Sequence, residues 1–248
     1  GCTISGTLAA LLAAGADPGH AAREALAFTA GALAHAQRFG GQARYEKVRR
    51  VDLPERPFQV WVGDPDAAEP TYRAHAIIVA TGAQTLMLGL ELERELIGHG
   101  VSTCATCDGL FFRNHTSAVA GGGDSAVEEA TFLTKFADHV TIVTRDTALS
   151  ASAVVVQKVL EHDDISVLTG ATPVGFAQAD GKFAGLEVER DGGREVIEAD
   201  GAFVFIGLSP NSELVRDLVE VDQQGFVVSD AGMQTSQPGI FVAGDVRS

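Results

Sequence analysis

The sequence predicts an α/β protein built on a doubly wound parallel sheet. Continuous apolar runs, typical of strands buried on both faces of a sheet, recur along the chain and end in small-residue turns at residues 76–83, 115–123, 202–207 and 239–245. From the second of these runs to the third, strand patterns alternate with helical patterns, which is the order of a parallel sheet covered by helices. A glycine cluster lies where the second run passes into a helix, as in doubly wound folds that bind ligands.

Length and composition allow two ordinary domains, since the chain has 248 residues and 46% of them are hydrophobic. The net charge of −15, from 33 acidic and 18 basic residues, argues against binding to nucleic acid or to an anionic membrane, because both need a positive surface. No apolar run approaches the roughly 20 residues of a spanning helix. The first residues lack the basic region of a signal peptide. We therefore expect a cytoplasmic protein.

Residues 1–38 predict two alanine-rich helices, separated by a break at Gly15–Gly19. The opening Gly-Cys-Thr-Ile-Ser and the later EALAFTAGALAHA segment resemble the C-terminal end of hydroxymethylpyrimidine (phosphomethylpyrimidine) kinases. The sheet and nucleotide site of that family have no counterpart here. A kinase fragment is therefore a remote alternative, and two helices packed on the following domain are the simpler interpretation.

From residue 40 the composition changes to alternating strand patterns. Strands are expected at residues 43–48, 58–62, 72–76 and 76–80. The last of these is continuously apolar and ends in Thr81-Gly82, a small-residue turn that lets a backbone approach a ligand. A charged connector at Glu91–His99 follows, and we expect a domain boundary there.

The second half of the chain predicts a doubly wound unit with a hairpin excursion. Strands are expected at residues 115–120, 140–143, 165–168 and 202–207, helices at 125–137 and 152–160, and hairpin turns at 179–182 and 191–193. A short helix beginning near Ser209 and a strand pair around Gly225 come next. The final apolar strand runs into Gly244-Asp245.

The glycine cluster fits the GxGxxG/A fingerprint of a dinucleotide-binding turn. The first glycine makes the tight turn, the second lets a pyrophosphate approach the backbone, and the small third residue lets helix and strand pack closely. The helix N-terminus then supplies free amides to the phosphates. The candidate cofactor-binding residues are Gly121, Gly122, Gly123, Asp124, Ser125 and Ala126.

The end of the following strand governs the choice between NADPH and NADH. A 2′-phosphate favours arginine and a free 2′-hydroxyl favours an acid. This chain has both, Arg145 and Asp146, so the sequence alone is ambivalent.

Two of the three cysteines form a CxxC, Cys104-Ala-Thr-Cys107, with Asp108 directly after it. A zinc site would need a second pair, and only Cys2 remains, so we expect no metal. Two structural thiols would leave the adjacent carboxylate unexplained. A redox pair makes chemical sense, because one thiolate attacks, the other resolves, and Asp108 gives or takes the proton.

Four segments together resemble thioredoxin reductases of the low-molecular-weight bacterial type. They are GVSTCATCDGLFFRN, GGGDSAVEEATFLTKFADHVTIV, FVFIGLSPNSEL and TSQPGIFVAGDV, in that family's order and spacing, and the match covers residues 40–248. The resemblance implies a pyridine-nucleotide domain that carries the CxxC and interrupts an FAD domain. Electrons would pass from NADPH through FAD to the disulfide and on to a thioredoxin-like protein. The two domains would rotate about hinges at Glu91–Gly100 and Gly207–Asn211, and a homodimer is expected.

The resemblance also assigns roles to individual residues. Cys107 would be the flavin-proximal thiol, Cys104 the thiol that attacks the partner, and Asp108 the acid–base group. Further cofactor contacts would come from Arg145, Ile206 and Gly207 on the nucleotide side, and from Thr81, Gly82, Gly244 and Asp245 on the FAD side.

The sequence departs from this family in two places. The family's first strand–GxGxxG–helix unit, which binds the FAD pyrophosphate, has no counterpart, and neither has its closing helix. The family's His-Arg-Arg followed four residues later by Arg becomes Thr144, Arg145, Asp146 and Ser150, so NADH is an alternative to NADPH.

We therefore predict an α/β chain in which a doubly wound NAD(P)-binding domain is inserted in an incomplete FAD-binding domain and is preceded by two Ala-rich helices. The expected boundaries are residues 1–38 for the helices, 39–92 and 209–248 for the FAD-binding domain, and 93–208 for the NAD(P)-binding domain with the CxxC. The expected activity is flavin-dependent thiol–disulfide oxidoreduction. The alternative is an FAD-free nucleotide-binding module whose CxxC is a regulatory thiol switch.

Overall fold

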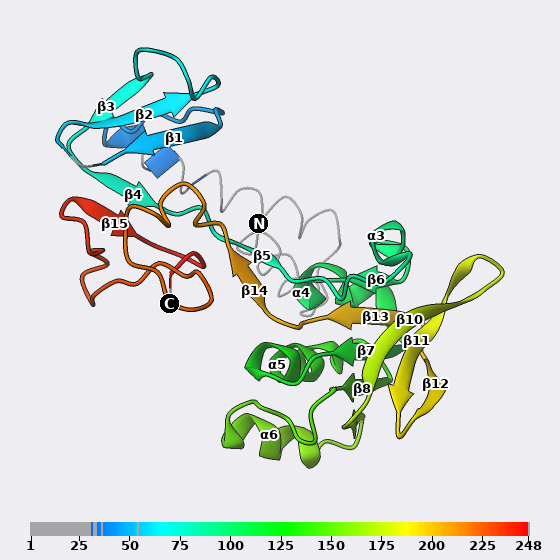
Figure 1. Cartoon of the computed structure of the whole chain (residues 1–248). Coiled ribbons are helices and arrows are strands. Elements are labelled where there is room, and N and C mark those ends of the chain that lie inside the picture. Colours follow the sequence, from blue (N-terminus) through cyan, green and yellow to red (C-terminus); the bar gives the residue numbers. More distant parts are fainter. Residues whose placement is uncertain (1–30, 32–33, 36, 54, 248) are drawn as a thin grey trace. The chain divides into compact units, whose positions relative to one another are not determined.

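The structure is a computed structural model that describes all residues except 1–30, 32–33, 36, 54 and 248 (Figure 1). The two helices predicted before residue 39 therefore lie almost wholly outside the described residues. Contacts divide the chain into two compact units. Unit 1 comprises residues 1–41 and 85–207, and unit 2 comprises residues 42–84 and 208–248. The boundaries expected at residues 92/93 and 208/209 remain a prediction about domains.

Unit 1 is built on a five-stranded sheet in the order β6-β13-β7-β8-β9, in which all pairs are parallel. Its strands are β6 Val101–Ser102, β7 Thr116–Ala120, β8 His139–Val143, β9 Ile165–Leu168 and β13 Gly201–Val204. The crossovers are helices α5, Asp124–Leu133, and α6, Ala153–Leu160, which lie together beside β7 and β8 in Figure 1. The predicted doubly wound sheet is confirmed.

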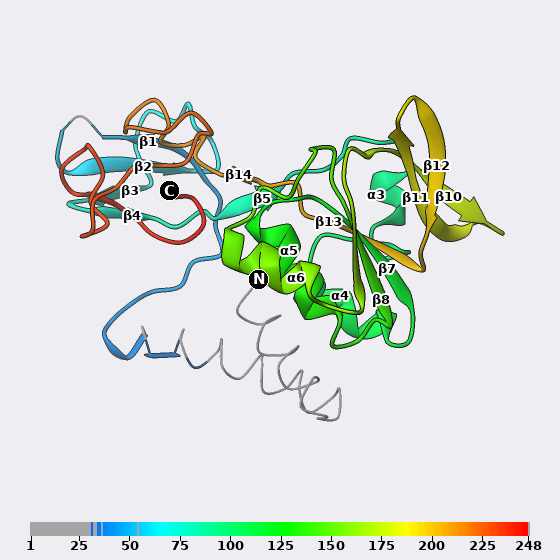
Figure 2. The same cartoon turned by 90° about the horizontal axis from the view of Figure 1, so that it is seen from below.

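A second sheet covers the opposite face of the parallel sheet. It is the antiparallel meander β10-β11-β12, whose strands are Thr172–Ala179, Lys182–Arg190 and Gly193–Glu198. Figure 2 shows this meander projecting at one end of the unit. The predicted hairpin excursion is thus confirmed, and its two turns hold Asp180 and Asp191 at positive φ.

Alternate residues of the central strands serve the two faces, as the period of two in a strand requires. Val119 and Phe203 are fully buried against helices α5 and α6. Their neighbours Ala118 and Ala202 are fully buried on the other face, with Phe183 of the meander. Unit 1 therefore has three layers, with the parallel sheet in the middle.

Three short elements complete unit 1. They are α3 Glu93–Leu96, α4 Ala105–Asp108 and the 3₁₀ helix η1 Gly109–Phe112. Glu93 is 2% exposed, and its carboxylate accepts the backbone N–H groups of Leu88, Gly89 and Leu90. The charged connector expected at Glu91–His99 is thus anchored within unit 1.

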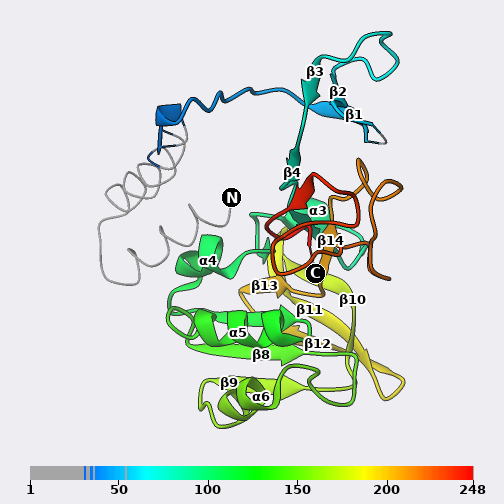
Figure 3. The same cartoon turned by 90° about the vertical axis from the view of Figure 1, so that its left-hand side faces the viewer.

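Unit 2 holds an antiparallel sheet, β1-β2-β3, and a parallel pair, β15-β4. These strands are β1 Val48–Asp52, β2 Phe58–Val62, β3 Tyr72–Ala74, β4 Ile77–Val79 and β15 Ile240–Val242. Their shared core contains Leu53, Phe58 and Ile240. Where the chain passes between the units, β5 Ala83–Thr85 pairs with β14 Leu208–Pro210. Figure 3 shows β4 and β14 from another side.

Three local predictions were wrong. Residues 43–47 are not a strand, because β1 begins only at Val48, where pairing with Val62 starts. The short helix expected after Ser209 is replaced by β14 and by turns, in which Ser212 carbonyl accepts the N–H groups of Val215 and Arg216. The strand pair around Gly225 is reduced to an isolated bridge between Val221 and Val227.

Candidate redox and nucleotide site

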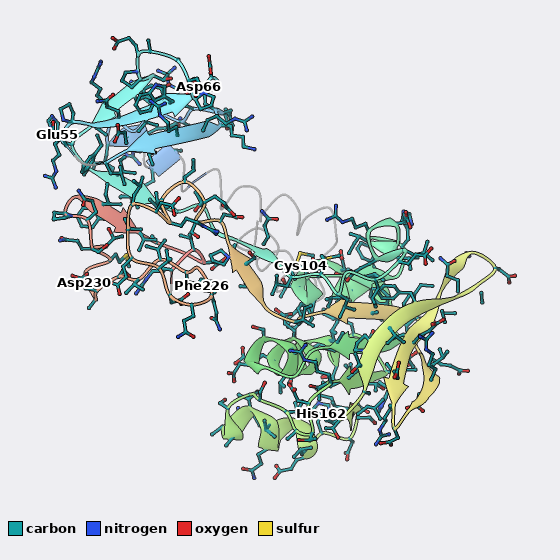
Figure 4. The ribbon with its side chains drawn as sticks, in the orientation of Figure 1. Glu55, Asp66, Cys104, His162, Phe226 and Asp230 are labelled. Carbon is teal, nitrogen blue, oxygen red and sulfur yellow. A yellow bond between two sulfur atoms is a disulfide. The ribbon has the colours of Figure 1, made fainter. Side chains whose placement is uncertain are left out.

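The redox turn is formed by Cys104 and Cys107, which are joined by a disulfide (Figure 4). Cys104 is the N-cap residue of α4, and the backbone N–H of Cys107 donates to Cys104 Sγ at 3.2 Å. Both cysteines are partly exposed. The turn therefore holds a closed disulfide at an accessible position, as a redox role needs.

Asp108 is held next to this turn by a residue that the sequence analysis did not single out. The Ser102 hydroxyl donates to Asp108 Oδ2 at 2.7 Å, and the backbone N–H of Cys104 donates to Ser102 Oγ at 3.0 Å. Ser102 is 2% exposed at the end of β6. The only signal in the sequence is a serine two residues before the first cysteine.

The redox turn packs against helix α5, which ties it to the nucleotide-binding turn. Ala105 of α4 is buried in the same core cluster as Ala126 and Leu133 of α5. A Cβ on Gly109 would lie 3.1 Å from the Leu133 side chain, so the chain after the CxxC runs close to the helix. The predicted catalytic residues, at α4, and the predicted nucleotide-binding residues, at the start of α5, thus belong to two elements of unit 1 that pack on each other.

The glycine turn between β7 and α5 has the geometry that the fingerprint predicts. Gly121 has φ of 145°, and a Cβ there would lie 2.2 Å from the Phe205 carbonyl oxygen. Gly123 is the N-cap of α5 and gives its first amides no side-chain acceptor. These amides are the groups that bind a phosphate at a helix N-terminus, so the turn fits a pyrophosphate.

The loop after β8 closes over the glycine turn. Ser150 N–H donates to the Gly122 carbonyl at 2.8 Å, and Ser152 N–H donates to Asp124 Oδ1 at 2.8 Å. Thr144 is buried, with its hydroxyl against Gly122, whereas Arg145 is exposed. Asp124 therefore positions the loop, and Arg145 is free to meet a ligand.

Ile206 and Gly207 follow β13 at the carboxyl end of the parallel sheet. Ile206 is 39% exposed and Gly207 has φ of 120°. Phe205 directly precedes Ile206, and its backbone N–H donates to the Ala120 carbonyl at 2.8 Å. That bond places this turn beside the start of the glycine turn, so both segments border one edge of the sheet.

Helix α5 carries a partly buried carboxyl group at Glu129. Burial raises its pKa, and the neighbouring charge of Glu128 raises it further. One of its carboxylate oxygens is buried and has no hydrogen-bond partner among the described residues. Sequence patterns offered no means of distinguishing this glutamate from the exposed Glu128.

The residues expected on the FAD side all lie in unit 2. Thr81-Gly82 follows β4 and Gly244-Asp245 follows β15, and the Ala243 N–H donates to the Val79 carbonyl at 2.9 Å. Both glycines have positive φ, and a Cβ at either would meet nothing within 4 Å. The two turns thus lie at one edge of a parallel pair with open space around them, where a ligand can approach.

Asn211 fixes the first of these turns. The Thr81 hydroxyl donates to the Asn211 carbonyl at 2.6 Å, and the Asn211 side-chain amide donates back to the Thr81 carbonyl at 3.0 Å. Next to this turn, unit 2 has an apolar cavity of about 150 Å³, lined by aliphatic side chains of β1, β2 and β4. Unit 2 therefore has a turn fixed by hydrogen bonds beside an apolar cavity, at a place where a ligand can bind.

Two features are absent from the described part of the chain. No group of three or more His, Cys, Asp or Glu side chains there is arranged to hold a metal ion. No helix in that part is long and apolar enough to cross a membrane.

Known sequences match most of the chain. The profile of the family described as pyridine nucleotide-disulphide oxidoreductase matches residues 6–248. The chain is 38% identical over 218 residues to the thioredoxin reductase of Listeria monocytogenes, which covers 87% of this chain and 67% of that protein. It is 40% identical over 219 residues to the thioredoxin reductase of Listeria innocua, with the same coverage.

Solved structures are similar as well. The crystal structure of Lactococcus lactis thioredoxin reductase in the FR conformation matches with a TM-score of 0.70 at 35% identity, covering 83% of this chain and 67% of that one. The thioredoxin reductase of T. acidophilum matches with a TM-score of 0.73 at 28% identity, covering 92% of this chain and 73% of that one.

Proposed function

Because the chain belongs to the pyridine nucleotide-disulphide oxidoreductase family, we propose that it passes electrons from NAD(P)H through FAD to the Cys104–Cys107 disulfide. A thioredoxin-like protein is the proposed final acceptor. One observation supports this proposal above the others. A disulfide with a carboxylate held beside it packs on the helix that begins at a dinucleotide-type glycine turn.

The pyridine nucleotide is proposed to bind at Gly121–Ala126. The free amides at the start of α5 suit its pyrophosphate. Arg145 suits a 2′-phosphate and Asp146 suits a free 2′-hydroxyl, so the proposal covers both NADPH and NADH. Ile206 and Gly207 would border the same ligand from the next strand.

FAD is proposed to bind along the turns at Thr81-Gly82 and Gly244-Asp245. The open space around both glycines is the observation that supports this choice. FAD, when bound, supplies a two-electron relay between a nicotinamide and a disulfide. The contribution of the chain is to bind it and to hold the redox turn.

The two cysteines and Asp108 would perform the exchange with the partner. Cys104 attacks the partner disulfide, Cys107 resolves the mixed disulfide, and Asp108 carries the proton. The accessible position of the turn supports a protein disulfide as the substrate. A homodimer in the cytoplasm remains part of the proposal.

A second function is favoured by one observation on unit 2. None of its described residues forms an α-helix, so the described part gives FAD no helix N-terminus for its phosphates. An FAD-free nucleotide-binding module, with Cys104 and Cys107 as a regulatory thiol switch, would fit that arrangement.

Coupled turnover separates the two functions. The purified chain, supplied with FAD, is mixed with NADPH or NADH and with an oxidised thioredoxin, and loss of nucleotide absorbance is followed. The reductase proposal predicts steady oxidation that stops in Cys104→Ser and in Cys107→Ser. Nucleotide oxidation that persists in both variants, or no oxidation of either nucleotide by the unmodified chain, would contradict the reductase proposal.

A further inference from the structure

We propose that Ser102 is a positioning residue, which holds Asp108 so that its carboxyl group delivers a proton to the thiol that leaves during disulfide exchange. This inference deepens the proposed function and rests on it for the use of the CxxC. It names a residue outside the CxxCD motif, on the strand before the redox turn.

The contacts of the Ser102 hydroxyl define this role. Its oxygen accepts the Cys104 N–H at 3.0 Å and lies 2.7 Å from Asp108 Oδ2 and 3.3 Å from the Cys104 carbonyl. A hydroxyl has one proton to donate, and the shorter distance to a charged acceptor favours the carboxylate. Ser102 thus connects Asp108 to the first residue of the redox turn.

Ser102 is itself rigidly placed. It is 2% exposed and is the last residue of β6, where it pairs with Phe203 of β13. Asp108, in contrast, is partly exposed at the end of a four-residue helix. A carboxylate in that position can turn toward water, and a buried hydroxyl from the sheet opposes this.

No other side chain among the described residues shares the task. Ser102 is the one side chain there that hydrogen-bonds Asp108, and Asp108 has no ion pair in that part of the chain. The elements packed on α4 are η1, which is uncharged, and α5, whose charged residues are Asp124, Glu128 and Glu129. The charged residues of these two elements are therefore all acidic and cannot hold a carboxylate in place.

The step is an exchange between the reduced turn and a disulfide RSSR. Cys104 thiolate attacks one sulfur, a bond forms between them, and the first RS⁻ leaves with the electron pair of the broken S–S bond. Cys107 then attacks the Cys104 sulfur, restores the intramolecular disulfide and releases the second RS⁻. The two protons of the original thiols end on the two leaving thiolates, and Asp108 accepts and returns them. Two electrons pass from the chain to RSSR.

The test compares two small disulfides that differ in their need for a proton. The chain is reduced with dithiothreitol, the reductant is removed, and the rate of reoxidation is measured in rapid mixing. Bis(2-hydroxyethyl) disulfide releases a basic alkyl thiolate, whereas 5,5′-dithiobis(2-nitrobenzoate) releases a weakly basic aromatic thiolate that leaves without help. Neither reaction needs a flavin or a nucleotide, so this test is independent of the proposed electron donor.

Ser102→Ala is expected to slow the alkyl reaction about tenfold, part of the roughly hundredfold or more that a positioned acid contributes, and to leave the aromatic reaction within about twofold. Added to Asp108→Asn, it should cause no further loss, because both changes remove one function. The matched control is Ser117→Ala. Ser117 is 1% exposed on β7 of the same sheet, and its hydroxyl has no hydrogen-bond partner among the described residues.

Three results would overturn the proposal. They are equal slowing with both disulfides, an alkyl rate unchanged in Ser102→Ala, and additive losses in the double variant. If Ser102→Ala does not fold, Ser102→Thr and Ser102→Val form a second pair of equal volume. Thr keeps the hydroxyl and is expected to react with the alkyl disulfide about tenfold faster than Val, and equal rates would refute the role.

Discussion

Asp200 shows how a single carboxylate stabilises unit 1. It accepts the backbone N–H of Thr116 at 2.8 Å and the Thr116 hydroxyl at 3.2 Å, and it lies 3.4 Å from His115 Nδ1. The backbone hydrogen bond is the main cause that lowers the pKa of Asp200 below its ordinary 3.8. Because the folded pKa is lowered, the stabilisation is present above pH 3.8 and is lost as the pH falls through the folded value.

Asp200→Ala is therefore expected to lower the free energy of unfolding by about 1 kcal/mol at neutral pH, the usual net value of a hydrogen bond at a solvent-screened site. The difference from the unmodified chain should shrink in acid. Urea unfolding at neutral pH and below pH 3.8 measures both. Asp163→Ala, at an exposed aspartate, serves as control, and a loss for Asp200→Ala that is the same at both pH values would refute the electrostatic cause.

Glu129 is the opposite case. Its pKa is raised above the ordinary 4.5, first by burial and then by Glu128. A raised folded pKa means that stability is greatest below pH 4.5 and declines as the pH rises through the folded value, where the buried carboxyl group must ionise.

Glu129→Gln is expected to increase the free energy of unfolding by about 1 kcal/mol at neutral pH, since it removes a poorly solvated charge. The gain should disappear in acid. The exposed neighbour supplies the control, because Glu128→Gln should change stability much less. Thermal unfolding across this pH range measures the two variants, and a Glu129→Gln chain that is less stable than its parent at neutral pH would show that the charge is favourable.

At the scale of single residues, the sequence allowed the prediction of site residues whose chemistry depends on their neighbours in the chain. Cys104, Cys107 and Asp108 lie in one turn because they are consecutive or nearly so. The bond from Ser102 depends on how the chain folds back after β6, and the burial of Glu129 depends on which side of α5 meets its neighbours. Neither can be read from local sequence.

At the scale of the elements, two glycines of the turn before α5, Gly121 and Gly123, differ in how much space a side chain would have. A Cβ on Gly121 would lie 2.2 Å from a backbone oxygen, at a φ of 145°. A Cβ on Gly123 would meet only the Ser150 hydroxyl at 3.9 Å, at a φ of −86°. The fold therefore requires the first glycine, whereas the second lines the space in front of the helix.

We expect Gly121→Ala to destabilise the chain by at least about 2 kcal/mol, from the strained backbone and the clash. Gly123→Ala should cost only about 1 kcal/mol, the usual penalty of alanine at an N-cap, but bind NADPH and NADH at least about tenfold more weakly, because its methyl group lies where the pyrophosphate approaches. Denaturant unfolding and nucleotide titration measure the two effects. Unchanged nucleotide affinity in Gly123→Ala would place the ligand elsewhere.

Elements with a persistent local pattern were predicted correctly, whereas elements that depend on distant pairing were not. Strands β7, β8 and β9 and helices α5 and α6 were predictable, because apolar runs and helical periodicity persist over whole segments. Strand β1 was misplaced because its start is set by pairing with β2. The expected helix after Ser209 failed because β14 pairs with β5, a partner more than 100 residues away.

For the molecule as a whole, the predicted domain organisation rested on the resemblance to a known family and not on the periodicity of apolar residues. Residues 42–84 and 208–248 form one unit although residues 85–207, which belong to the other unit, separate them in the sequence. Local propensity cannot predict such an interrupted order. The domain boundaries expected from the four motifs and their known order stay a prediction. The segment before residue 39, predicted as two helices, lies largely outside the described residues and stays a prediction.

The proposed flavin-dependent electron transfer is tested most directly by the visible absorbance spectrum of the purified chain, recorded before and after FAD is added and again after NADPH. The reductase proposal predicts a flavin spectrum that remains after free FAD is removed. It should bleach with NADPH as two alkylatable thiols appear at Cys104 and Cys107. A chain that retains no flavin from excess FAD, and whose disulfide NADPH leaves intact, would contradict the proposal and identify a nucleotide-binding module with a thiol switch.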